Sequence, residues 1–221
     1  MKKTFICLAN SRKNSGYCVA GKLIDNFNWI RPISNRSTEE ISEIEMRFEN
    51  GELPKLLDIV ALEIKAQKPN QFQSENNLID TASYWVKTGS FVANKLSTIC
   101  DDPCNIWKNL NSSYQGINDR ISSENTKHIS HSLVLLKLHE SKILVRVEGA
   151  EFNNAKRKVR LQFELDNKKY ILPITHPEIE RQYLSGKNGE YTISREHYVT
   201  ISLGLPHADG FCYLFAAAII L

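Results

Sequence analysis

The chain has 221 residues, of which 42% are hydrophobic and 24% charged, a balance typical of a globular protein with one large core or two of ordinary size. No segment approaches the roughly 18 apolar residues of a membrane helix, which argues against a membrane protein. The net charge is +3, yet residues 1–36 carry seven Lys and Arg against one Asp, whereas residues 37–52 carry six Glu against one Arg. This pattern indicates either a basic face that attracts a polyanion or ordinary solvated surface.

The N-terminal segment predicts a strand rather than a secretory signal. Lys2 and Lys3 precede an apolar run of only about six residues, shorter than the core of a signal peptide, and polar residues follow at once. The five cysteines are odd in number and scattered along the chain, so they do not form a disulfide framework. We therefore expect a cytoplasmic protein.

The first half of the chain predicts a β-rich domain over residues 1–110. Strands are expected at 4–8, 17–24, 29–33 and 56–64. The polar residues 10–16 between the first two strands predict a hairpin with a loop of moderate length. Helical segments are expected at 37–51, where hydroxyls and glutamates suit a helix start, and at 81–100.

The second half predicts another β-rich domain over residues 131–221, after a polar crossing segment at 111–130. Strands are expected at 132–138, 143–147, 158–165, 170–174, 198–203 and 211–220, with a short helix at 177–184 that begins at a proline. Asp166-Asn167 predicts a tight turn between two of these strands. The fold class is therefore mainly β with helical insertions, and two small barrels fit the pattern better than one sandwich.

The first candidate site lies in the first predicted hairpin and the strand that follows. Arg and Lys side chains bind phosphate, Ser and Asn add neutral donors, and Trp offers a surface on which a base stacks. The residues concerned are Asn10, Ser11, Arg12, Lys13, Trp29 and Arg31. The alternative is a solvent-exposed basic turn beside a core tryptophan.

The second candidate site is a basic cluster formed by Lys156, Arg157, Lys158 and Arg160, which Lys168 and Lys169 join across the predicted hairpin. Strand alternation places Lys158 and Arg160 on one face, with apolar side chains on the other. This face suits a phosphate-tracking surface. A charged strand face that prevents edge pairing is the equally open alternative.

Two further clusters carry weaker signals. Asn118 and Arg120 flank Asp119 in a polar triplet, which is a secondary ligand candidate or a loop-fixing pair. Cys100, Cys104, His128 and His131 supply four soft ligands, but their spacings depart from the usual zinc patterns, so no metal is expected. No phosphate loop, nucleophile elbow or zinc-protease motif occurs, and no cofactor is expected.

Several short motifs follow one another in order along nearly the whole chain. They are Cys7-Leu8-Ala9-Asn10-Ser11-Arg12-Lys13, Cys18-Val19-Ala20-Gly21, Trp29-Ile30-Arg31-Pro32-Ile33-Ser34, Leu56-Leu57-Asp58-Ile59-Val60, Asn118-Asp119-Arg120-Ile121, Ser132-Leu133-Val134-Leu135-Leu136-Lys137, Ile201-Ser202-Leu203-Gly204, Cys212-Tyr213 and Ala216-Ala217-Ala218-Ile219-Ile220. These motifs and their order along the chain resemble the bacterial dual OB-containing domain family. The resemblance implies two tandem OB-like barrels and a nucleic-acid-binding role in prokaryotic defence or nucleic-acid processing. The polar stretch 71–77 matches the family only loosely.

We therefore expect a module that binds single-stranded or structured DNA or RNA. Arg12, Lys13 and Arg31 would contact phosphate, Trp29 would stack, and the second basic cluster would extend the track. Two alternatives stay open: an enzyme or sensor with a nucleotide-like small molecule in an anion pocket around Arg12 and Arg31, and a protein-interaction module. The sequence leaves the choice of DNA or RNA, the oligomeric state and the pathway open.

Overall fold

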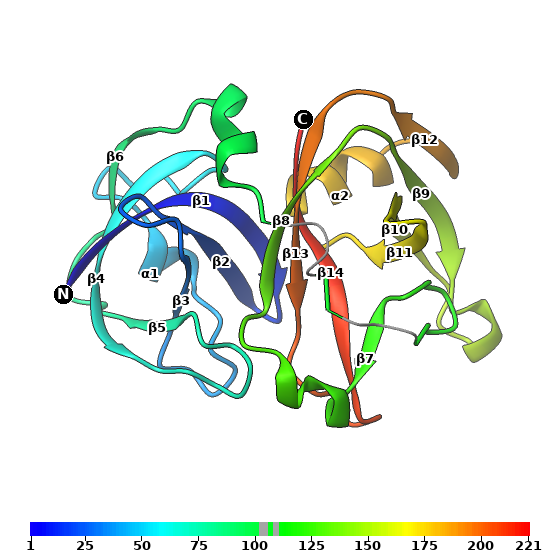
Figure 1. Ribbon diagram of the computed structural model, residues 1–221, viewed down its shortest axis with the longest axis horizontal. Coiled ribbons are helices and arrows are strands. Elements are labelled where there is room, and N and C mark those ends of the chain that lie inside the picture. Colours follow the sequence, from blue (N-terminus) through cyan, green and yellow to red (C-terminus); the bar gives the residue numbers. More distant parts are fainter. Residues whose placement is uncertain (102–105, 108–110) are drawn as a thin grey trace. The chain divides into compact units, whose positions relative to one another are not determined.

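The computed structural model describes residues 1–101, 106–107 and 111–221 (Figure 1). The chain divides into two compact units: unit 1 comprises Met1–Ile99 with Ser130–Ser132, and unit 2 comprises Cys100–Ile129 with Leu133–Leu221. The segment expected as a crossing thus falls mainly in unit 2. Within the described ranges, no helix has the length and apolar character needed to span a membrane.

Unit 1 is a closed barrel. Its strands are β1 (Lys2–Lys13), β2 (Gly16–Leu23), β3 (Trp29–Ile33), β4 (Asp58–Gln67), β5 (Asn76–Ile79) and β6 (Val86–Ser90). The first five follow the order β1-β2-β3-β5-β4, and β4 pairs again with β1 to close the barrel. The β3–β5 pair is parallel and the others are antiparallel. This is the connectivity of an OB barrel, and the expectation for the first half is confirmed.

The long strand β1 makes closure possible because it belongs to two faces of the barrel. Residues 2–6 pair with β4, residues 5–13 pair with β2, and the register shifts between Cys7 and Ala9. A bulge of this kind bends a strand and increases its twist. The barrel interior is filled by apolar side chains, with Phe5 and Trp85 in edge-to-face contact at 6.1 Å between ring centroids.

Three local predictions for unit 1 are wrong. The first hairpin has no moderate loop, because pairing continues to Lys13 and Gly16 and a tight turn with Asn14 at φ 50° closes it. The helix expected over 37–51 shrinks to α1 (Glu43–Met46), which starts with a capping box between Ser42 and Glu45. The segment 81–100 forms β6, which pairs with β4, and the 3₁₀ helix η1 (Ala93–Ile99) instead of an α-helix.

Unit 2 contains eight strands in two sheets among its described residues. The first sheet has the order β11-β10-β9-β12, and the second has the order β7-β14-β13-β8. Their bounds are β7 (Arg120–Ser122), β8 (Leu133–Leu138), β9 (Ser141–Glu148), β10 (Lys156–Leu165), β11 (Lys168–Pro173), β12 (Gly189–Ile193), β13 (His197–Leu203) and β14 (Phe211–Ile220). The helical segments are η3 (Ser123–His128), η4 (Ala150–Phe152) and α2 (Pro177–Leu184). The helix expected at 177–184 and the strand expected at 211–220 are confirmed.

The two sheets of unit 2 together repeat the connectivity of unit 1 in a more open form. β8 pairs with β13 and the next strand, β9, pairs with β10, just as the two halves of β1 pair with β4 and β2. The third strand, β11, reaches the last strand through a parallel bridge between Ile174 and Ala216. In both units the α-helix lies between the third and fourth barrel strands. Unit 2 is therefore a second OB-like unit. It is a half-barrel, whereas unit 1 is a closed barrel.

Candidate functional site

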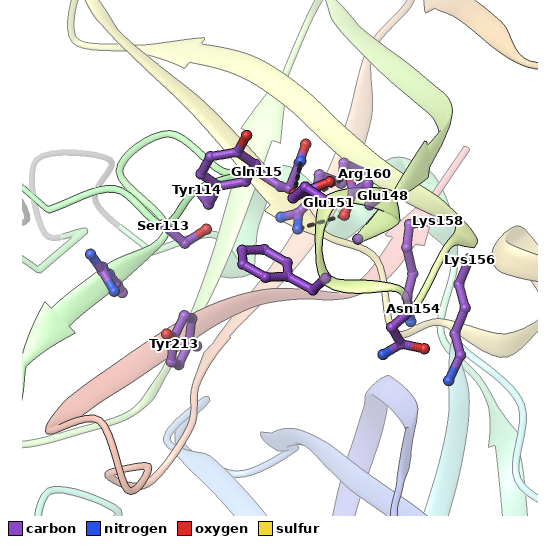
Figure 2. A pocket seen from close by; sticks show the side chains of 13 residues that line it. Ser113, Tyr114, Gln115, Glu148, Glu151, Asn154, Lys156, Lys158, Arg160 and Tyr213 are labelled. Carbon is purple, nitrogen blue, oxygen red and sulfur yellow. Dashed lines mark hydrogen bonds and ion pairs between the residues drawn. The ribbon is translucent and has the colours of Figure 1, made fainter.

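Unit 2 has an open pocket of about 480 Å³ at the loop between β9 and β10 (Figure 2). The loop supplies one wall, β10 supplies basic side chains, β7 and β14 supply Arg120 and Tyr213, and the segment before β7 supplies another wall. Figure 2 shows Tyr114, Gln115 and Glu151 toward one end of the pocket and Asn154, Lys156 and Lys158 toward the other.

The loop between β9 and β10 is held in a compact turn by its first residue. Gly149 has a φ of +78°, and a Cβ atom at this position would lie 2.7 Å from the carbonyl oxygen of Asn154. The Gly149 carbonyl accepts hydrogen bonds from the backbone N–H groups of Phe152 at 3.1 Å and Asn154 at 2.9 Å. This loop turns Phe152 outward, and its side chain is 70% exposed.

The facing wall, residues 113–116, is fixed by buried polar contacts. Asp119 is buried and accepts hydrogen bonds from the backbone N–H of Ser113 at 2.7 Å and its hydroxyl at 2.5 Å. Arg146 on β9 donates to the carbonyl of Gln115 at 2.5 Å. Tyr114 is 75% exposed, and its ring meets that of Phe152 edge to face with centroids 5.9 Å apart. Two exposed aromatic rings thus meet at the pocket.

The basic side of the pocket follows the alternation of β10. Lys156 and Lys158 are exposed and Arg160 is half-buried, whereas Val159 is buried on the opposite face, so the predicted alternation is confirmed. Arg160 donates to Glu148 through Nε at 2.7 Å and Nη2 at 3.0 Å. Its charge is therefore committed to a carboxylate, while the two lysines face the pocket.

Glu148 is held ionised beneath the pocket. Burial acts to raise its pKa, but hydrogen bonds and the charges of Arg160 and Arg146 outweigh burial and leave the pKa below its ordinary value. The Arg146 Nε lies 3.0 Å from Glu148 Oε1. This ion-paired carboxylate links β9, β10 and the 113–116 segment, because Arg146 also holds Gln115.

Arg120 forms the wall of the pocket that β7 provides. Its guanidinium lies over the ring of Phe211 at 4.0 Å from the centroid, and Nη1 lies 3.9 Å from Asp209. The hydroxyl of Tyr213 donates to the same carboxylate at 2.5 Å. Stacking and pairing hold this cation at the edge of the pocket.

The structure brings part of the first candidate cluster together in unit 1. Ser11 pairs with Cys18 across the hairpin, and burial raises the pKa of the Cys18 thiol while the positive charges of Arg31 and Lys13 both act to lower it. Ser11 is buried and donates to the Cys18 carbonyl at 3.4 Å, whereas Arg12 is exposed and Lys13 half-buried at the end of β1. Asn10 donates to the Pro54 carbonyl at 3.0 Å. Of these four residues Arg12 is exposed, Asn10 and Lys13 are half-buried and Ser11 is buried.

Trp29 is half-buried and Arg31 is buried, and both have partners within unit 1. The ammonium of Lys22 lies 5.3 Å from the centroid of the Trp29 ring, so a cation already covers one part of that aromatic surface. Arg31 is buried and its Nη2 lies 3.5 Å from Glu75, which also accepts a hydrogen bond from Ser132. The guanidinium is thus part of a buried polar cluster.

Among the secondary candidates, Lys156 and Arg120 line the pocket and the others have local partners. Arg157 donates to the carbonyls of Leu184 and Gly186, both at 2.7 Å, and so caps the C-terminal end of α2. Asn118 occupies a turn with φ 49° and donates to the Lys169 carbonyl at 2.9 Å.

Cys104 of the candidate zinc set lies outside the described residues. Cys100 and His131 are half-buried and His128 is exposed. No group of three or more His, Cys, Asp or Glu side chains suited to a metal ion occurs in the described ranges.

The dual OB-containing domain matches residues 3–219. The chain belongs to the dual OB-containing domain family. No curated protein and no solved structure matches the chain. OB folds commonly bind nucleic acid on the face of their second and third strands and at the loops after strands one and four. In unit 2 of this dual OB protein, the loop at the pocket is the one after the first barrel strand.

The sequence-based reasoning did not single out four pocket residues: Tyr114, Gln115, Glu151 and Phe152. They lie in two polar segments that are far apart in the chain and that carry no periodicity. The available signal was an aromatic residue within each polar segment, Tyr114 after Asn and Ser residues and Phe152 before two Asn residues, because large apolar side chains in polar loops have no obvious core to fill.

Proposed function

We propose that this dual OB protein binds single-stranded nucleic acid in the pocket of unit 2. The observation that carries the proposal is the meeting of two exposed aromatic side chains, Tyr114 and Phe152, with two exposed lysines, Lys156 and Lys158, in one open pocket. Stacking platforms beside a basic groove are the arrangement by which proteins bind single strands.

Each part of the pocket has a separate role in this proposal. The aromatic rings stack on unpaired bases, which are unavailable in a duplex, and the lysine ammonium groups contact phosphates. Ionised Glu148 is neutralised by Arg160 and Arg146, so it does not repel the strand. Arg12 and Lys13, exposed and half-buried at the end of β1, are retained as candidate phosphate contacts of unit 1.

The shape and lining of the pocket favour a polymer over the two alternatives. This pocket differs from the anion pocket of a nucleotide sensor around Arg12 and Arg31, because it is open and neither of these residues lines it. A protein-interaction surface would be apolar without adjacent basic groups, whereas here lysines accompany the aromatic pair.

The test is fluorescence anisotropy with labelled single-stranded RNA, single-stranded DNA and duplex DNA over a range of salt concentrations. We expect both single strands to bind more tightly than duplex, with affinity that falls as salt rises. In Lys156→Ala/Lys158→Ala, the slope of log affinity against log salt should become less steep by about 1.4, because each lost phosphate contact removes about 0.7.

The matched control is Lys168→Ala/Lys187→Ala, which removes the same charge from exposed positions of unit 2 outside the pocket. This variant should retain a slope near that of the unmodified protein. An equal loss in both double variants, or binding independent of salt, would refute the assignment of the site.

A further inference from the structure

The pocket contains an amide and a carboxylate directly beside its aromatic pair. Gln115 Nε2 donates to Glu151 Oε1 at 3.5 Å, and each of these residues is the chain neighbour of one of the two rings, Tyr114 or Phe152. Two facing dipeptides, Tyr114-Gln115 and Glu151-Phe152, therefore each supply one aromatic ring and one polar side chain to the pocket. Figure 2 shows Tyr114, Gln115 and Glu151 in the same part of the pocket.

Glu151 differs from the other carboxylate of the pocket in its partners. Glu148 is held by the two arginines Arg146 and Arg160, which satisfy both of its oxygens. The Glu151 carboxylate is exposed, and Gln115 is the partner that the structure gives it within the described residues. A negative group of this kind disfavours phosphate, so its contribution to a single-strand site must come from contacts with a base.

The donor and acceptor order of this pair matches one base. The amide N–H of Gln115 is a donor, and the two oxygens of Glu151 are adjacent acceptors. The Watson–Crick edge of guanine carries the complementary order: the O6 acceptor, then the N1–H and N2–H donors. A carboxylate therefore accepts from guanine in a bidentate manner while the amide donates to O6.

The other bases fail at one or more positions of the same array. Cytosine and adenine each offer one amino group next to a ring-nitrogen acceptor, which faces a carboxylate oxygen unfavourably. Uracil and thymine offer one N–H between two acceptors. An unmatched contact leaves a polar group without a partner, and this loss is the physical basis of selection between bases.

We propose that the pocket of unit 2 is a guanine-selective subsite, in which Glu151 and Gln115 read the Watson–Crick edge of a base stacked on one of the two rings, Tyr114 or Phe152, whose planes lie at 72° to each other. This proposal rests on the proposed single-strand function and names the base that the same pocket prefers. Arg146 acts as a positioning residue, because it holds the Gln115 backbone at 2.5 Å and so sets the amide opposite the carboxylate.

The experiment measures the affinity of the full chain for single strands of about twelve uridines, a length within the site sizes of OB folds. One central uridine is replaced by guanosine, by adenosine or by inosine, which lacks the N2 amino group. Parallel strands of thymidine with the matching deoxynucleosides report whether RNA and DNA are treated alike. We expect guanosine to bind about tenfold more tightly than adenosine, with inosine between them.

The decisive variant is Glu151→Gln, which keeps the size of the side chain and removes an acceptor and the charge. It should bind the guanosine strand no better than the adenosine strand, while its affinity for the all-uridine strand stays equal or rises slightly. The matched control is Glu164→Gln, an exposed glutamate of β10 outside the pocket, which should keep the guanosine preference.

The outcomes separate this proposal from the function on which it rests. Equal affinity of the unmodified protein for guanosine and adenosine strands, or a preference retained in Glu151→Gln, overturns guanine selection while single-strand binding stands. Failure of every strand to bind overturns both proposals.

Discussion

Arg31 illustrates how burial decides the role of a basic residue. Its guanidinium lies in the interior of unit 1 at 3.5 Å from Glu75, whose side chain is 2% exposed. We predict that Arg31→Ala lowers the free energy of unfolding by about 3–5 kcal/mol, because it leaves a carboxylate buried without its cation. Urea denaturation followed by circular dichroism measures this change.

Arg12→Ala is the matched control for this prediction, since Arg12 is exposed on the same barrel and should change stability by less than about 0.5 kcal/mol. An Arg31→Ala protein with unchanged stability but reduced affinity for single strands would contradict the structural role. It would instead support the phosphate contact that the sequence suggested.

Phe152 presents the opposite case, an aromatic side chain that the fold does not need. Because its ring is 70% exposed, Phe152→Ala should leave thermal stability nearly unchanged. It should weaken binding to single-stranded RNA or DNA about tenfold, the usual loss for one stacked base. Tyr84→Ala, which removes a 50% exposed aromatic ring from unit 1, should bind like the unmodified protein. A similar loss in both variants would contradict a specific role for Phe152.

At the residue scale, the sequence could predict which side chains share a face of a strand, because strand alternation alone determines this. Lys158 and Arg160 share a face because β10 alternates, and that inference needs no distant partner. The ion pair of buried Arg31 depends on Glu75, which directly precedes β5, the parallel neighbour of β3, and is remote in sequence. No local pattern contains this information.

The loop between β9 and β10 positions the aromatic and carboxylate groups as one element. We predict that Gly149→Ala displaces this loop, because the new Cβ would meet the Asn154 carbonyl oxygen at 2.7 Å and the φ of +78° is strained for alanine. Affinity for single strands should fall about tenfold or more, as when stacking is lost, and stability should fall by more than about 1 kcal/mol.

Gly51→Ala separates backbone strain from the steric contact. Gly51 has a φ of +84°, and an added Cβ would meet nothing within 4 Å. This variant should lose about 1 kcal/mol of stability through strain and retain its affinity. Unchanged binding in Gly149→Ala would show that the loop does not form the site. Anisotropy and urea denaturation measure both quantities.

At the element scale, prediction succeeded where turn chemistry or a long apolar run is decisive. Asp166 and Asn167 adopt φ values of 50° and 58° and join β10 to β11 in the expected tight turn. The strands β5, β6, β7 and β12 were missed because each has only three to five residues, too few to show a clear alternation, and β6 and β12 are also largely exposed. The apolar residues around β6 imitated helical spacing, but pairing with β4 outweighs that pattern.

Two buried histidines couple the stability of unit 2 to pH. Burial lowers the pKa of both His176 and His197 from the ordinary 6.5. Below pH 6.5 the unfolded chain therefore binds protons that the folded unit excludes, and stability falls as pH falls. Each histidine contributes up to about 1.4 kcal/mol per pH unit until its folded pKa is reached.

Urea denaturation between about pH 5 and pH 8 tests this coupling. His176→Phe should reduce the pH dependence, since it removes one titrating ring while it keeps the aromatic volume. Stability that rises on acidification would contradict the lowered pKa values.

At the scale of the whole molecule, the order of elements was the most predictable property. In unit 2 the apolar runs and turns predicted four strands, the helix α2 and the strands β13 and β14 in the observed order. In unit 1 the first three strands and β4 were predicted, whereas β5 and β6 were not. The site was less predictable, because Tyr114 and Phe152 converge only when the β9–β10 loop folds against the segment before β7. Unit 1 contributed the more conspicuous basic motif, but the open pocket with exposed rings lies in unit 2.

The most direct test of the central proposal is to map where a single strand contacts the chain. A photoactivatable single-stranded RNA would be bound to the full chain, cross-linked by light, and the attached residues identified by mass spectrometry. The account predicts cross-links in the peptides that contain Tyr114 and Phe152, and their loss at high salt. Cross-links confined to the peptides of unit 1 around Arg12 and Trp29 would contradict it.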